Sequence, residues 1–252
     1  MTLPASGAIS LSQVSTEMNQ ASNTTISLGD AMVRSLSGTY DMDNLHGKSR
    51  RTGQDGWGGV YQVGHVPGVD TVNYFTVPYG CYSITAYVVG AGGGGSGVNW
   101  QGGDACHGGG GGAGGYAIGT FGVTPQETLT VVSGGGGMGS TTNGATKDGK
   151  ANSTSAGGNS YVARGGTVLI AGYGGRGATP AYYSPGGAGG TSTGGNIQNA
   201  TGAAGGLGGN WYGGAPGGAP AGQPGGNGFG AGGAGGGYGA TPGIPGAVWI
   251  SY

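Results

Sequence analysis

The sequence predicts a mainly β fold, in which a small β-sandwich carries long glycine-rich loops packed as polyglycine II helices. Three observations predict this fold. Most of the 71 glycines lie between Gly90 and Gly246. Glycine recurs at every third position in parts of that stretch, as in Gly230–Gly239. Short runs of alternating apolar residues precede, interrupt and close the glycine-rich stretch, which is typical of strands.

The glycine spacing fits extended left-handed helices with three residues per turn. Such helices have no internal hydrogen bonds, so their N–H and C=O groups point outward and can bond neighbouring helices. Glycine allows the close approach because it has no Cβ. The alternative is a flexible linker, which glycine-rich composition often forms. Aromatic residues that recur inside the tract, such as Tyr116, Tyr173 and Phe229, favour the packed array.

The first 56 residues predict a separate, short, mainly helical or extended segment. Ser12 is an expected N-cap, and Ser27 with Asp30 has the spacing of a capping box. The expected helices are too short and too few to bury a core of their own. We therefore expect an attachment segment over 1–56 and a glycine-rich β-sandwich domain over 57–252.

Seven runs in the second domain have the alternation of strands. In the second run, for example, Ile84, Ala86 and Val88 alternate with Ser83, Thr85 and Tyr87. The turn Thr124–Glu127 predicts a hairpin between the third and fourth strands. The expected strands are 71–77, 81–89, 115–123, 128–132, 160–164, 167–171 and 247–252.

Composition argues against several classes of function. Charged residues make up only 7% of the chain and the formal net charge is −1, whereas a nucleic-acid-binding protein normally has a basic stripe. No run of 18 apolar residues could span a bilayer as a helix. The N-terminus lacks the basic start and apolar stretch of a secretory signal peptide. A protein of this kind that acts outside the cell would be released by another route, such as host lysis.

The sequence offers few residues for catalysis. His46, His65 and His107 stand without an evident Ser or Asp partner, and the nine acidic residues are scattered rather than paired as in glycosidases. The glycine runs lack the Lys-Ser/Thr that follows a phosphate-binding loop. We expect no enzyme activity and no cofactor.

The two cysteines leave two interpretations open. Cys81 and Cys106 could form a disulfide, or both could be free thiols, and the second is favoured because one lies on an expected strand and the other in a distant loop. Cys106 with His107 lacks the ligand spacing of a zinc site, so no metal is expected.

The N-terminal segment carries a first resemblance. The runs GAISLSQVSTEMN, ISLGDAMVRSLSG and LHGKS, in order within Ser6–Ser49, resemble a module at the start of many tailed-phage tail and fibre proteins. The resemblance implies a virion protein at a tail or fibre tip. It also implies that residues 1–56 attach to other phage tail or fibre proteins, and a homo-oligomer in the virion is possible.

The second domain carries another resemblance. The runs FTVPYG from Phe75, ITAYVVGAGGGG from Ile84, GGGGGAGGYA from Gly108, VTPQETLTVVSGGGG from Val123 and PGAVWISY at the C-terminus resemble a glycine-rich domain of phage and bacterial surface proteins. Its expected glycine array is similar to that of distal long-tail-fibre adhesins of T-even-type phages. The chain lacks the N-terminal region of those adhesins, so their mode of attachment does not carry over.

Aromatic residues in the expected loop tips are the candidate binding residues. Tyr and Trp on rigid loops, with Asn and Ser beside them, are typical of binding surfaces. Alternatively, these aromatic side chains cover the ends of the glycine array. The resemblance implies a receptor that is a bacterial outer-membrane protein or a surface glycan. The candidate receptor-binding residues are Trp100, Tyr182, Tyr183, Trp211 and Tyr212.

The leading hypothesis is therefore a receptor-binding adhesin at a phage tail or fibre tip. A second hypothesis is a structural virion component that plugs or decorates a fibre without touching a receptor. A third is an ice-binding or surface-coat protein, although a flat binding face would favour regular small residues over Trp and Tyr.

Overall fold

The computed structural model describes residues 69–78, 81–97, 99–101, 104–140, 154–179, 185–209, 213–219, 228–236 and 240–252, and only the backbone of 99–101 and 104–106. These residues form strands and extended segments, with no helix among them, which confirms the mainly β prediction. The helices expected after Ser12 and Ser27, and the boundary between 1–56 and 57–252, lie outside the described residues.

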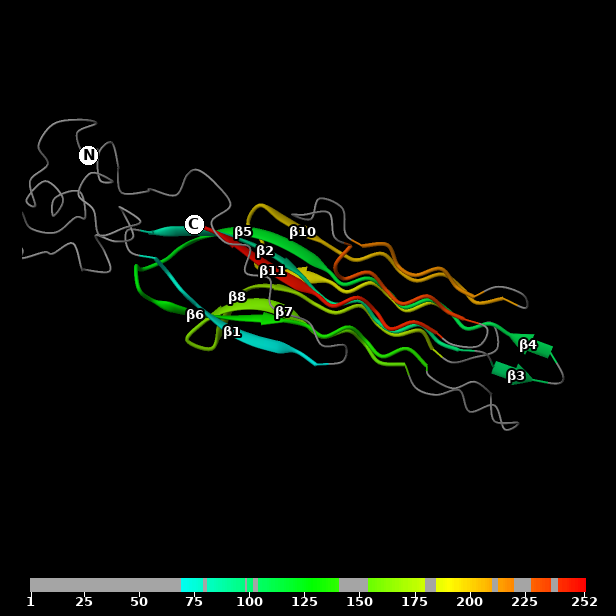
Figure 1. Ribbon diagram of the computed structural model, residues 1–252. Coiled ribbons are helices and arrows are strands. Elements are labelled where there is room, and N and C mark those ends of the chain that lie inside the picture. Colours follow the sequence, from blue (N-terminus) through cyan, green and yellow to red (C-terminus); the bar gives the residue numbers. More distant parts are fainter. Residues whose placement is uncertain are drawn as a thin grey trace, which may run out of the picture.

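The strands form two antiparallel sheets that face each other at one end of the molecule (Figure 1). The first sheet has the order β1–β6–β7–β8–β9 and the second β10–β5–β2–β11. A small third sheet pairs β3 with β4 at the far end. The strands are β1 (Thr71–Thr76), β2 (Ser83–Val89), β3 (Asn99–Gln101), β4 (Asp104–Cys106), β5 (Tyr116–Gly122), β6 (Thr128–Ser133), β7 (Ser160–Arg164), β8 (Thr167–Gly172), β9 (Ser192–Thr193), β10 (Gln198–Ala200) and β11 (Ala247–Ser251).

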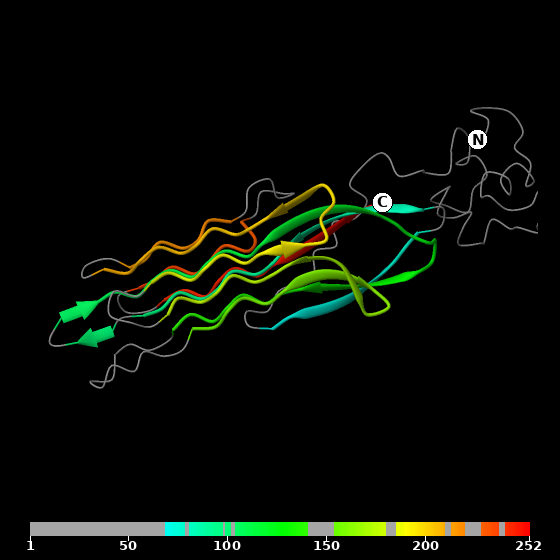
Figure 2. The same ribbon diagram turned by 180° about the vertical axis from the view of Figure 1, so that it is seen from behind.

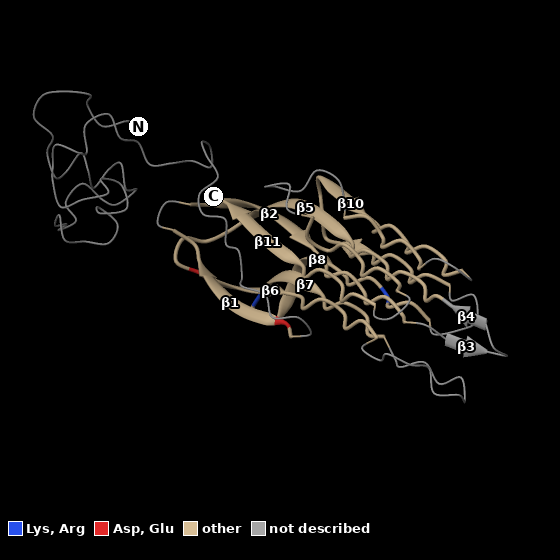
Figure 3. Ribbon diagram, turned by 45° about the vertical axis from the view of Figure 1, so that its right-hand side comes forward, with Lys and Arg blue, Asp and Glu red and all other residues tan. Residues whose placement is uncertain are grey.

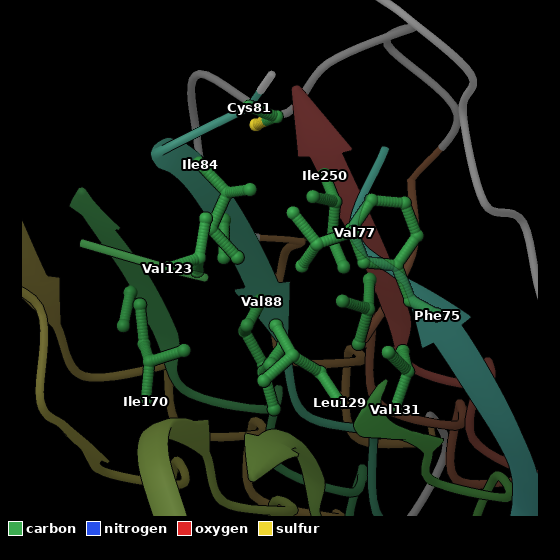
Figure 4. Packing of buried hydrophobic residues seen from close by; sticks show 14 residues of the cluster. Phe75, Val77, Cys81, Ile84, Val88, Val123, Leu129, Val131, Ile170 and Ile250 are labelled. Atoms are coloured by element: carbon green, nitrogen blue, oxygen red, sulfur yellow. The ribbon is translucent and has the colours of Figure 1, made fainter. Parts of the chain in front are cut away.

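The hydrophobic core lies between the two sheets (Figure 4). The alternation of β2 turns Ile84, Ala86 and Val88 inward, where they are at most 1% exposed. From the opposite sheet, Leu129 and Val131 of β6 enter the same core and are fully buried. The period of two in each strand thus explains why the two sheets bury one face each against the other.

A second cluster covers the outer face of the β10–β5–β2–β11 sheet. Trp249 of β11 lies opposite Tyr87 of β2 and is only 3% exposed. Phe229 packs edge-on against Trp249, with 5.5 Å between ring centroids. Phe229 and the buried Tyr116 of β5 therefore belong to the apolar cover of this sheet.

All seven expected strands are present, but the expected hairpin is wrong. The strands on either side of the Thr124–Glu127 turn belong to different sheets, so that β6 pairs with β1 and β7 rather than with β5. The turn bonds the end of β1 instead, because Val77 N–H donates to the Glu127 carbonyl and Gln126 N–H to the Val77 carbonyl, each at 2.9 Å. The short strands β3, β4, β9 and β10 were not expected.

The glycine-rich segments continue the strands toward the far end of the molecule and return (Figure 2). We call the following residues the glycine array. Segments 90–97, 134–140, 173–179, 201–209 and 230–236 run away from the sheets, and segments 107–115, 154–159, 185–191, 213–219 and 240–246 run back.

Hydrogen bonds of segment 90–97 repeat with a period of three. The N–H groups of Gly90, Gly93 and Ser96 donate in turn to the carbonyls of residues 115, 112 and 109. The N–H groups between them alternate between segments 154–159 and 240–246. The carbonyls accept in the same rhythm from segments 134–140, 173–179 and 230–236. Six neighbours and three residues per turn are the arrangement of packed polyglycine II helices, as the glycine spacing predicts.

Segment 107–115 has six neighbours of its own. It donates to segments 173–179, 201–209 and 230–236 and accepts from 90–97, 185–191 and 213–219. Segments 90–97 and 107–115 are therefore the central pair, and residues 90–97 and 108–115 are all buried. The other eight segments surround them and bond one another in a closed ring.

The ring and the central pair stack as three rows. The middle row consists of 134–140, 90–97, 107–115 and 201–209. The first outer row consists of 154–159, 173–179 and 185–191, and the second outer row of 213–219, 230–236 and 240–246. In each outer row the middle segment bonds both of its neighbours, as Arg176 N–H does with the Ala188 carbonyl at 2.9 Å. The array thus has two flat faces, one for each outer row.

Candidate functional site at the far end of the glycine array

The alternating directions of the array bring its connections to one end. Each segment that runs away from the sheets is followed by one that returns, so the residues on either side of every such connection lie far from the sheets (Figure 1). These flanking residues are Gly97 and His107, Ser140 and Thr154, Thr179 and Pro185, Gly209 and Gly213, and Gly236 and Ala240.

The hydrogen-bond register shows that these segments end at a similar level. Gly236 N–H donates to the Ser96 carbonyl at 3.2 Å, and Ser140 N–H donates to the Gly95 carbonyl at 3.1 Å. On the other side of the array, His107 N–H donates to the Gly209 carbonyl at 3.0 Å. Five connections from different parts of the sequence therefore leave the array from one common end, which we call the distal end.

The candidate residues predicted from the sequence belong to these connections. Trp100 lies in β3, opposite Ala105 of β4, in the hairpin between the central pair. Tyr182, Tyr183, Trp211 and Tyr212 lie outside the described residues. The flanking residues place all three connections at the distal end, and the prediction that the five aromatic side chains share one face stays a prediction.

Hydroxyl side chains near the distal end replace missing backbone partners. Ser155 Oγ accepts from Met138 N–H at 2.6 Å, and Thr241 Oγ1 accepts from Ala234 N–H at 2.7 Å. Thr154 Oγ1 donates to the Ala178 carbonyl at 2.5 Å. Sequence reasoning missed these residues, although a Ser or Thr near the end of a glycine run is the signal that could have identified them. They hold the ends of the segments that carry the connections.

Charge is nearly absent from the described array (Figure 3). Arg176, on the middle segment of the first outer row, is exposed. The other Asp, Glu, Lys and Arg side chains that the structure describes lie at the sheets. There Arg164 Nη2 bonds Glu127 Oε1 at 2.9 Å, and Asp70 Oδ1 accepts from Gly135 N–H at 2.9 Å. The described part of the distal end offers polar groups and backbone rather than a charged centre.

The described residues contain neither a metal-binding cluster nor a membrane-spanning helix. Within them, no group of three or more His, Cys, Asp and Glu residues could hold a metal ion. Among the same residues there is also no helix long and apolar enough to cross a membrane.

Comparison with known families matches the sheets and the array together. A family model described as a glycine-rich domain matches residues 67–252. The chain belongs to this glycine-rich domain family. The matched part of the chain includes every described strand and segment of the array and excludes residues 1–66. No curated protein matches the chain.

The structure describes the side chain of one of the two cysteines in this glycine-rich domain. Cys81 is a free thiol, 5% exposed, and its Sγ donates to the Ser83 carbonyl at 3.1 Å. Burial raises the pKa of the Cys81 thiol. Cys81 therefore forms no disulfide with Cys106, as the favoured interpretation expects for this cysteine.

Proposed function

We propose that this protein is a receptor-binding adhesin at the tip of a phage tail or tail fibre. The observation that carries the proposal is the common distal end, from which five connections of the glycine array leave together. A rigid scaffold that brings several connecting segments to one end suits recognition, because binding residues are often found on loops that such a scaffold positions.

The sequences of the connections support a binding role. Three of them carry Trp100, the pair Tyr182 and Tyr183, and the pair Trp211 and Tyr212. Aromatic residues give a large contact area for little loss of rotamer entropy. Their neighbours are uncharged for the most part, so binding would rest on stacking and hydrogen bonds and depend weakly on salt. A bacterial outer-membrane protein or a surface glycan is the proposed receptor.

The point where the described chain begins also supports the proposal. Val69 lies beside Gly135, directly after β6, at the end of the array next to the sheets. A chain that enters near the sheets leaves the distal end available for a receptor. The resemblance of Ser6–Ser49 to phage tail and fibre proteins suggests that residues 1–56 attach to other virion proteins.

A cell-binding assay tests the proposal. Fluorescently labelled full-length protein is titrated onto candidate host cells, alongside Trp211→Ala and Tyr182→Ala. Each variant is expected to weaken binding roughly thirtyfold, since truncating a binding hot spot typically costs about 2 kcal/mol. Tyr74→Ala is the matched control, because Tyr74 is 66% exposed but lies on β1, at the sheets.

Two results would overturn the proposal that the protein is an adhesin. One is parental affinity of both tip variants. The other is an equal loss of binding in Tyr74→Ala, which would show that exposed tyrosine contributes without regard to position. If the tip variants bind normally and particles without the protein fail to assemble, the chain is a structural component of the virion instead.

A further inference from the structure

Among the described residues, the first outer row of the array carries one charged side chain, Arg176. Arg176 is exposed, and its side chain makes no hydrogen bond or ion pair within the described residues. The other described Asp, Glu, Lys and Arg side chains, at Asp70, Glu127 and Arg164, all bond protein groups. Arg176 thus differs both from its surroundings and from the other charged residues.

Tyr173 lies one turn from Arg176 on the same side of the segment. Both residues donate their N–H to segment 185–191, and both accept from segment 107–115 through their carbonyls. Because their backbones have equivalent partners, their side chains project from the same face. The two Cα atoms are about 9 Å apart along the axis, since three residues rise roughly 3.1 Å each.

The ring of Tyr173 is held in place and partly open to solvent. Its hydroxyl lies 3.3 Å from Thr193 Oγ1, while 36% of the residue is exposed. Beside it, Asn159 Oδ1 accepts from Gly174 N–H at 3.0 Å, which leaves the Nδ2 group of Asn159 as a donor. The face therefore offers an aromatic ring and an amide donor that hydrogen bonds hold in place, and an exposed guanidinium on the same segment as the ring.

We propose that this face of the first outer row binds an anionic saccharide through Tyr173 and Arg176. The apolar side of a sugar ring packs on the Tyr173 ring, and a carboxylate, sulfate or phosphate of the same glycan pairs with the Arg176 guanidinium. The two positions lie about 9 Å apart along the segment, so we expect an oligosaccharide rather than a single sugar to contact both. Arginine suits such a group because its planar fork can donate two parallel hydrogen bonds.

The chemistry of the face favours a glycan over a nucleic acid. A nucleic acid would require a row of cations to match its phosphates, whereas the described part of this row has only Arg176. The exposed positions near it are small or hydroxylated, as at Ala188 and Thr191. The site lies on the side of the array rather than at its distal end, so it does not depend on the proposed receptor-binding tip.

A panel of acidic oligosaccharides tests the inference, with each one measured beside a neutral counterpart of the same ring structure. Tetragalacturonate with its methyl ester is one pair, and hyaluronan tetrasaccharide with its methyl ester is another. The full-length protein is expected to bind at least one acidic member ten times more tightly than its neutral counterpart. That preference should weaken as salt rises, because salt screens the charge on an exposed arginine.

Substitutions separate this site from general electrostatic attraction. Arg176→Gln should weaken binding of the acidic glycan at least tenfold with an unchanged melting temperature. Tyr173→Ala should weaken binding of both members of a pair, and Tyr173→Phe should retain it. A double variant, Arg176→Gln with Ala215→Arg, has the net charge of the parent but carries the arginine on the second outer row, where Ala215 is exposed. This variant should bind the acidic glycan no better than Arg176→Gln alone.

Three results would overturn the inference. They are equal binding of every acidic glycan and its neutral counterpart, parental affinity of Arg176→Gln, and recovery of binding on addition of Ala215→Arg. Trp211→Ala should keep the affinity for the acidic glycan. Failure of this side site can therefore be told apart from failure of the proposed tip.

Discussion

At the scale of single residues, the space around each glycine decides what that position tolerates. A Cβ at Gly233 would overlap the carbonyl oxygen of Thr241, and one at Gly93 would overlap the carbonyl of Arg176. At Gly218, on the second outer row, a Cβ would meet nothing within 4 Å. None of these three glycines has a positive φ, so the missing Cβ, and not an unusual backbone conformation, makes glycine necessary at the first two.

Alanine substitutions at Gly233 and Gly218 should therefore change the free energy of unfolding in opposite directions. Gly233→Ala is expected to destabilise the domain by about 3 kcal/mol, because it separates segments joined by the bonds of Gly233 N–H to Gly93 and of Gly111 N–H to Gly233. Gly218→Ala should stabilise it by about 0.5 kcal/mol through the unfolded chain. Denaturant unfolding measures both. Equal stability of the two variants would mean that the tract is a linker.

Alkaline pH should lower the stability of the fold, because a buried thiol and a buried tyrosine hydroxyl must stay protonated in it. Burial, and to a lesser extent the charge of Tyr87, raises the pKa of the Tyr116 hydroxyl, and burial raises that of the Cys81 thiol. A raised pKa in the folded state means that the unfolded chain loses its proton first. The stability is then complete below the unfolded pKa and is lost as pH rises through the folded pKa.

The melting temperature should accordingly fall above about pH 9, where unfolded cysteine and then tyrosine begin to ionise. Scanning calorimetry from pH 7 to 11 measures the fall. The double variant Cys81→Ala and Tyr116→Phe removes both groups and should show a shallower decline over that range. An identical decline in the parent and the double variant would contradict this explanation.

At the scale of elements, the period of three determines which neighbouring segment each residue of the array faces. One glycine inserted after Gly93 would turn each later N–H of segment 90–97 toward the wrong neighbour. We expect that insertion to abolish cooperative folding, as seen by circular dichroism and thermal melting. One glycine inserted between Gly144 and Ala145, in the connection 141–153, should cost less than 1 kcal/mol, since lengthening a loop adds little closure entropy. Similar melting temperatures of the two insertion variants would show that the segments do not need a fixed register with their neighbours.

Local patterns predicted the strands better than their pairing. Alternation in β2 identified Ile84, Ala86 and Val88 as the inward face, and the spacing of glycine identified packed helices. The hairpin between β5 and β6 was wrong because a turn is a local signal, whereas the pairing of β6 with β1 comes from long-range contacts. The strands β9 and β10 are two and three residues long, too short to show a period.

The sequence identified candidate residues for the site but not the place in the fold from which their connections leave the array. Trp100 and Trp211 stand out as large side chains among glycines. The common end of the connections that contain them follows from the directions of the described segments, which the sequence does not state. Arg176 gave no signal of its own, because its proposed role depends on the row in which it lies and on the lack of other charged side chains in the described part of that row.

At the scale of the whole molecule, the sheets and the array form one unit that should fold without the N-terminal segment. The family match begins at residue 67 and the core lies within the two sheets, so removal of residues 1–50 should leave a folded domain. The shortened protein should melt like the parent and, if residues 1–56 attach it to a virion, should be missing from purified particles. Normal incorporation would contradict the attachment role, and loss of cooperative melting would contradict independent folding.

The continuity between strands and array has a mechanical consequence. Segment 90–97 follows directly from β2, and segment 107–115 leads directly into β5. Strands and segments share one long direction (Figure 1), and their hydrogen bonds cross it. Tension along that direction loads many transverse bonds together in shear, instead of opening them one after another. The molecule is therefore built to carry a pull between its two ends with little extension.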